Sequence, residues 1–127
     1  MSEEKPAFRL LDIDGADRNL IAYELNDGEV TDDELTPYWR RFDQAVDDGR
    51  RLRIYAEMHA IPRFGDALVV EKLKRLTAAT SAIERMALVG DARWLAVYAS
   101  AAAPMFSAQI RHFTLAEKDD ALAWIRR

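Results

Sequence analysis

Four titratable side chains are spaced so that the fold could bring them to one place: Glu57, His59, Asp66 and Asp91. Each ends or follows a segment expected to be a strand, and in an open α/β sheet such groups gather at the carboxyl ends of the strands. His59 is the natural acid or base, because an unperturbed imidazole titrates near neutrality. Catalysis by His59 with Glu57 is therefore one hypothesis. A surface-loop histidine beside ordinary helix caps is the interpretation we favour, because position in a fold does not establish function.

Other familiar chemistry is missing from the sequence. It contains no cysteine, which excludes disulfides, thiolate catalysis and cysteine metal sites. His59 and His112 are too far apart to form a close-spaced zinc-binding pair, and we expect His112 to be a hydrogen-bonded strand residue. The five glycines form neither a G-x-G-x-x-G motif nor a P-loop. We therefore expect no metal, no cofactor and no catalytic residue.

Composition points to one domain over residues 1–127, with an ordered core from about residue 8 to 127. Half of the residues are hydrophobic, 31% are charged, and the net charge is −4 with scattered basic residues. That pattern disfavours nucleic acid and anionic lipid headgroups as partners. The acidic, polar start lacks an export signal, which predicts a cytoplasmic protein. The apolar stretch at 91–106 is too short for a membrane span, which takes about 20 residues.

Hydrophobic periodicity predicts alternating strands and helices. An antiparallel pair at 8–13 and 19–25 opens the chain, joined through an Asp-Gly turn. The later strands are expected at 52–58, 86–89 and 109–113, and the later helices at 66–79, from Asp91 to Pro104, and after Thr114. The order ββαβαβαβα implies right-handed crossovers and a mainly parallel sheet.

The first helix has the clearest start signal. Thr31 and Glu34 form a capping box, flanked by Val30 and Leu35 as a hydrophobic staple. Pro37 lies awkwardly far inside this helix. It either kinks the helix or restarts it with the preceding threonine as a new cap, and the sequence leaves both open.

Three motifs together resemble the SpoIIAA-like branch of the STAS proteins. They are the Thr-x-x-Glu helix start after an Asp-Gly turn, the Val-Gly-Asp-x-x-Trp element at 89–94, and the closing Glu-x-x-x-Ala-x-x-Trp-Ile at 117–125. The resemblance covers 8–127. It implies a single α/β domain with a mainly parallel sheet of four or five strands, an antiparallel edge strand and four helices. Anti-sigma-factor antagonists and the lipid-carrying CRAL-TRIO (SEC14-like) domains share this architecture.

One departure from that resemblance bears on function. Phospho-switching antagonists carry a serine or threonine at the start of the second helix, where a phosphate would meet the helix dipole. This chain reads Phe-Gly-Asp-Ala-Leu at 64–68, and the next hydroxyl is Thr77. A phosphorylation switch is therefore not expected.

Two helices are predicted to carry excess apolar surface. Phe64 and Leu68 fall on the side of the 66–79 helix opposite its core stripe. The helix after Asp91 is apolar all round, with Trp94 and Tyr98 on one face and Leu95 on the other, so something should cover its second face. We predict a non-enzymatic module that binds a small hydrophobic or lipid-like molecule between these helices. The alternatives are a STAS-like protein-interaction domain using the same surface, and a homodimer. The predicted binding residues are Phe64, Leu68, Trp94, Tyr98, Met105 and Phe106.

Overall fold

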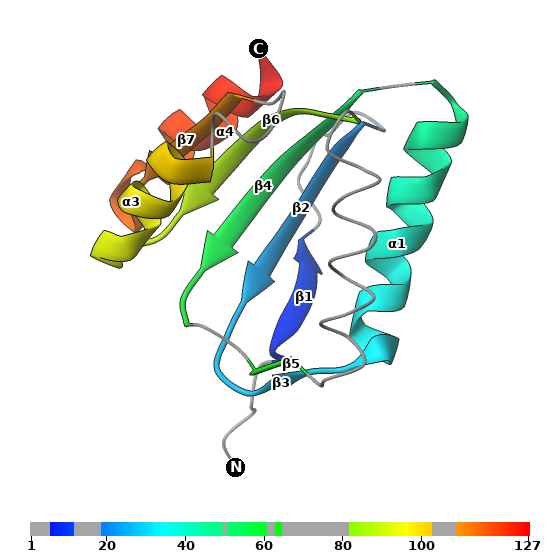
Figure 1. Cartoon of the computed structure of the whole chain (residues 1–127), viewed down its shortest axis with the longest axis horizontal. Helices are drawn as coiled ribbons and strands as arrows, with labels where there is room; N and C mark the ends of the chain where they lie inside the picture. The colour runs from blue at the N-terminus through cyan, green and yellow to red at the C-terminus, as the bar shows by residue number, and fades with distance from the viewer. Residues whose placement is uncertain (1–5, 12–18, 50, 61–62, 65–81, 103–108) are drawn as a thin grey trace.

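The fold is given by a computed structural model that describes residues 6–11, 19–49, 51–60, 63–64, 82–102 and 109–127 (Figure 1). Five strands stand side by side in the order β1-β2-β4-β6-β7, and a separate two-stranded ladder pairs β3 with β5. The strands are β1 (Phe8–Leu11), β2 (Leu20–Leu25), β3 (Glu29–Val30), β4 (Leu52–Met58), β5 (Arg63–Phe64), β6 (Ile83–Val89) and β7 (Gln109–Phe113). The helices are α1 (Asp32–Asp47), α3 (Arg93–Ala102), a 3-10 turn η2 (Leu115–Glu117) and α4 (Lys118–Arg126).

The sheet has the predicted topology. β1 runs antiparallel to β2 at one edge, and β2, β4, β6 and β7 are parallel neighbours. Parallel neighbours need a crossover between them, and α1 and α3 supply two of these crossovers. The expected α/β class, with a mainly parallel sheet and an antiparallel edge strand, is confirmed.

Each face of the sheet has its own core. Phe42 of α1 packs with Ile54 of β4, and Ala99 of α3 lies in a cluster on the same face. Because side chains alternate along a strand, Tyr55 points to the opposite face, where it packs with Ile125 of α4. In Figure 1, α1 lies beside β1 and β2, whereas α3 and α4 lie near β6 and β7. One face therefore carries α1 and α3, and the other carries α4.

The start of α1 matches its sequence signal. The Thr31 hydroxyl accepts from the Glu34 N–H at 3.2 Å, and Oε1 of Glu34 accepts from the Thr31 N–H at 3.1 Å. Val30 and Leu35 are buried in one cluster, as the staple predicts. α1 runs without interruption through Pro37, so the helix is not restarted there. Residues 32–47 form one element.

The structure corrects two expectations drawn from the sequence. The described part of the chain contains three α-helices rather than four, because the helix expected at 66–79 lies outside the described residues. Phe64 was expected on the side of that helix opposite its core stripe, and instead its backbone belongs to β5, where it pairs with Val30 of β3. The pairing is anchored by the Arg63 N–H, which donates to the carbonyl of Gly28 at 2.7 Å. A two-residue ladder has no periodicity that a sequence pattern could reveal.

Within the described ranges, none of the helices has both the length and the apolar character that crossing a bilayer requires.

Candidate functional site

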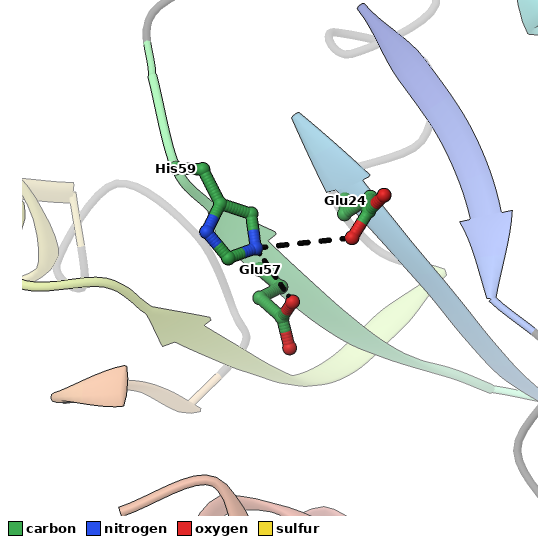
Figure 2. A group of neighbouring side chains, drawn as sticks. All are labelled: Glu24, Glu57 and His59. Atoms are coloured by element: carbon green, nitrogen blue, oxygen red, sulfur yellow. Dashed lines mark hydrogen bonds and ion pairs between the residues drawn. The ribbon is translucent and has the colours of Figure 1, made fainter. Parts of the chain in front are cut away.

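Two carboxylates from neighbouring strands meet near the carboxyl end of the sheet. Glu24 of β2 and Glu57 of β4 are register partners in a parallel pair, so their side chains leave the same face. His59, just past the end of β4, turns its ring toward both (Figure 2). The N–H of His59 donates to the carbonyl of Leu25 at 2.9 Å, which extends the pairing of the two strands and fixes the position of the histidine. We call these three side chains the carboxylate–histidine cluster.

The imidazole of His59 is held at one nitrogen. Nε2 lies 2.7 Å from Oε2 of Glu57 and 3.8 Å from Oε2 of Glu24. An ionised carboxylate can only accept, so the proton sits on Nε2 and is donated to Glu57. The Glu24 and Glu57 side chains are 3% and 8% exposed, and that of His59 is 31% exposed. The ring therefore separates two buried acids from the surface.

Each buried acid has its own cation. NH2 of Arg9 lies 2.7 Å from Oε1 of Glu24, and Nζ of Lys118 lies 3.3 Å from Oε1 of Glu57. Tyr55 also donates its hydroxyl to Oε1 of Glu57 at 2.9 Å. No buried side-chain polar atom in the described ranges lacks a hydrogen-bond partner. Two carboxylates are thus matched by two cations, and buried ions are tolerated when paired in this way.

These contacts set the protonation of the cluster. Burial raises the pKa of Glu57, but hydrogen bonds from His59, Tyr55 and Lys118 lower it further than burial raises it, and the net pKa lies below its usual value. Burial raises the pKa of Tyr55 strongly, and its hydrogen bond to Glu57 adds to the rise. Glu57 is therefore ionised at neutral pH and Tyr55 stays a neutral donor.

Carboxylate oxygens and imidazole nitrogens are common metal ligands, and the cluster holds them close together. One such atom from each of Glu24, Glu57 and His59 lies within 4.8 Å of the others. Its charge balance does not favour that use. Arg9 and Lys118 already contact one oxygen of each acid, so a divalent ion would leave two positive charges in excess. The geometry instead fits a network that fixes the orientation of His59.

A cavity of about 250 Å³ lies beside this network. Its apolar wall comes from Met58, Leu95 and Leu115, and its polar groups are His59 and Asp91. Met58 ends β4, Asp91 follows β6 and Leu115 follows β7. The cavity therefore lies at the carboxyl ends of three parallel strands. Ligands of open α/β sheets bind at this edge.

Residues 90 and 91 shape the cavity. A Cβ added at Gly90 would lie 2.6 Å from Cδ1 of Leu95 and 2.7 Å from the carbonyl oxygen of Met58, so only glycine fits there. Asp91 was predicted to cap the helix now called α3, and that prediction is wrong. Its Oδ1 instead accepts from the N–H of Leu115 at 2.9 Å, which ties the end of β6 to η2.

A larger hollow of about 310 Å³ lies between β7 and α4 and is lined by Arg111, Glu117 and Trp124 among others. The Arg111 guanidinium lies over the Trp124 ring at 5.6 Å, so the hollow is the groove between two packed elements. It reaches the carboxyl end of β7 alone, whereas the smaller cavity lies at the ends of β4, β6 and β7. We therefore take the smaller cavity as the candidate site.

The structure describes only some of the predicted binding residues. Leu68, Met105 and Phe106 lie outside the described residues. Trp94 and Tyr98 lie on α3, and their side chains, like that of Phe64, are not among those described.

The buried side of α3 is nevertheless clear. Leu95 and Ala99 face the sheet, whereas Val97 is 69% exposed. That something covers the second apolar face of α3 stays a prediction.

The structure brings Glu57 and His59 together, and it adds four partners that sequence reasoning missed: Glu24, Tyr55, Arg9 and Lys118. A signal for Glu24 existed, because it is the one charged residue of an otherwise largely apolar strand, next to the strand that carries Glu57. His112 is confirmed as a satisfied strand residue, since its Nε2 lies 2.7 Å from the carbonyl oxygen of Gly90.

The sequence model of one family, described as SpoIIAA-like, matches residues 20–126. The chain belongs to the SpoIIAA-like family. The match covers every strand of the main sheet except β1, together with the carboxylate–histidine cluster. No curated protein sequence matches this SpoIIAA-like chain.

A solved structure supports the fold. A crystal structure of a protein of the DUF3478 family from Shewanella loihica, described as having a SpoIIAA-like fold, superposes with a TM-score of 0.72 at 15% identity. The alignment covers 98% of each chain. At that identity the similarity concerns the fold alone. A SpoIIAA-like fold suggests a regulatory or binding domain without catalytic activity.

Proposed function

We propose that this SpoIIAA-like protein is a non-enzymatic binding module that takes a small, largely apolar molecule into the cavity beside His59. The cavity itself carries the proposal: Met58, Leu95 and Leu115 give an apolar wall with two polar groups at one end. Small-molecule sites are built this way, mostly apolar with a few placed polar groups. At about 250 Å³ the space suits a fragment-sized ligand.

The carboxylate–histidine cluster is compatible with a binding role. Both oxygens of Glu57 are engaged, by His59 on one side and by Tyr55 and Lys118 on the other. A carboxylate held ionised in this way orients the histidine but has no proton to give. The proposal therefore assigns His59 to ligand contact, and the lipid-like ligand predicted near α3 becomes a molecule that contacts Leu95 of that helix.

A fluorescent fatty-acid or alcohol probe tests the proposal. Ala60 lines the cavity without belonging to the core, so Ala60→Trp should fill the cavity and abolish the rise in probe fluorescence. Ala96→Trp is the matched control, because Ala96 is exposed on α3 and does not line the cavity. Equal uptake by both variants, or no uptake of any probe by the wild type, would contradict the proposal.

A second candidate is regulation through a protein partner, the role that SpoIIAA-like domains commonly have. The exposed Val97 of α3 favours it, because a large apolar side chain in water often marks a contact surface. A pull-down comparing the wild type with Val97→Asp and with Leu68→Asp separates the two candidates. Loss of one specific band in either variant would favour the partner. A homodimer and a cytoplasmic location stay predictions.

A further inference from the structure

We infer that the cavity selects a small amine with an apolar body. This inference rests on the proposed function, which gives the cavity a small-molecule ligand, and it goes further by naming the chemical class of the ligand's polar group. Two polar groups at the cavity decide that class: the second ring nitrogen of His59 and the free oxygen of Asp91.

The first group is Nδ1 of His59. Figure 2 shows the ring with one nitrogen toward the two carboxylates and the other on the opposite side. Because Nε2 carries the proton donated to Glu57, Nδ1 of the uncharged imidazole form is an acceptor. Nδ1 makes no hydrogen bond within the described ranges, and His59 lines the cavity. A ligand that donates a hydrogen bond would satisfy this nitrogen.

The second group is the carboxylate of Asp91. Oδ1 accepts from the N–H of Leu115, and this bond fixes the side chain at the cavity. Oδ2 has no hydrogen bond or ion pair within the part of the chain that is described. It places a negative charge on the same cavity as Nδ1 of His59, so the polar groups of the cavity favour a donor that is also a cation.

The other residues around the cavity do not change its preference for a cationic hydrogen-bond donor. The Glu24 and Glu57 charges are already matched by Arg9 and Lys118. Among the described lining residues there is no lysine or arginine that could hold an anionic head group. The apolar lining is Met58, Leu95 and Leu115, which suits a short hydrocarbon chain. A carboxylate of the same length would meet Asp91 with like charge.

A matched set of three probes tests the inference on the full chain. Hexylamine, hexanol and hexanoate share one chain and differ in charge and in donor capacity. Each is titrated into ¹⁵N-labelled protein at a mildly alkaline pH. We expect hexylamine to bind most tightly, hexanol more weakly and hexanoate weakest, with amide shifts centred on His59, Leu95 and Leu115.

Two variants locate the selectivity. Asp91→Asn removes the charge and should weaken hexylamine binding by about tenfold while changing hexanol binding little. His59→Gln keeps an amide that can reach Glu57 but loses the acceptor at the Nδ1 position, so it should weaken both donors by about threefold to tenfold. Asp120→Asn, an exposed acid on α4 that does not line the cavity, is the control and should bind like the wild type.

The outcomes separate the inference from the proposed function. If hexanoate binds as tightly as hexylamine, or if Asp91→Asn leaves the amine affinity unchanged, the selection of amines is overturned while the cavity remains a binding site. If none of the three probes shifts the cavity amides, both fail. Thermal unfolding of each variant confirms that it is folded, so a lost affinity is assigned to the removed group.

Discussion

Glu24 and Glu57 lie side by side on neighbouring parallel strands, and both are buried, yet a cation reaches each of them from a different element. Arg9 comes from the antiparallel edge strand and Lys118 from the first turn of α4. The two ion pairs therefore join β1 to β2 and α4 to β4. Breaking one partner of such a pair is costly because the other charge stays buried.

The lowered pKa of Glu57 predicts a pH dependence of stability. A carboxyl group whose folded pKa lies below its usual value of 4.5 stabilises the folded state above that pH and loses this contribution as the pH falls through the lowered pKa. We expect the free energy of unfolding of the wild type to fall more steeply between about pH 5 and pH 3 than that of Glu57→Gln. Urea titrations at several pH values measure it. The exposed Glu29→Gln is the control, and parallel curves for Glu57→Gln and the wild type would refute the prediction.

The Tyr55 hydroxyl is predicted to stabilise the fold through its hydrogen bond to Glu57. Tyr55→Phe removes a donor to a buried, ionised carboxylate and should lower the free energy of unfolding by about 1.5–3 kcal/mol. A double-mutant cycle with Glu57→Gln isolates the pair, and we expect the two effects to be non-additive. Additive losses would show that the hydroxyl acts through packing alone.

The capping box of α1 predicts that two substitutions lower the free energy of unfolding, one of them more than the other. Thr31→Ala removes one acceptor for the helix start and should cost about 0.5–2 kcal/mol. Glu34→Ala should cost more, because Oε2 of Glu34 also accepts from the N–H of Phe8 at 3.0 Å and ties the helix to β1. Urea midpoints compare the two variants, and a smaller loss for Glu34→Ala would contradict this reading.

Gly90 is predicted to be intolerant of any side chain. The added methyl of Gly90→Ala meets both the Leu95 side chain and a backbone oxygen, and we expect a loss of about 1–3 kcal/mol. Shortening the neighbour in Gly90→Ala with Leu95→Ala should not restore stability, because the Met58 oxygen remains 2.7 Å from the new methyl. Gly49→Ala is a useful comparison, since its cost comes from a φ of 72° in open space. If Gly90→Ala were as stable as the wild type, the steric argument would be refuted.

Sequence reasoning succeeded where the signal is local. The capping box at Thr31 involves neighbouring residues, and the strand carrying Glu57 shows its period of two within seven residues. It failed where partners are distant. Asp91 has the spacing of an N-cap, but its carboxylate bonds to Leu115, and only the pairing of β6 with β7 brings those two residues together.

The candidate site was predicted only in outline. Glu57 and His59 were singled out as a pair, and they are in contact. Glu24 was missed because its role depends on the register of β2 against β4, which a one-residue slip would reverse. Lys118 reaches the site only because α4 covers this face of the sheet. Such relationships arise from tertiary packing and have no counterpart in residue spacing.

The core under α4 also sets an order of events in folding. Leu20 and Ala22 near the start of the chain pack in one cluster with Ala121 and Ile125 near its end. Such long-range contacts raise the contact order and slow folding. During synthesis, this face of the sheet stays open until the last helix has left the ribosome. Until then Glu57 lacks its ion pair with Lys118, and the nascent chain exposes the apolar residues that α4 covers, a state prone to aggregation.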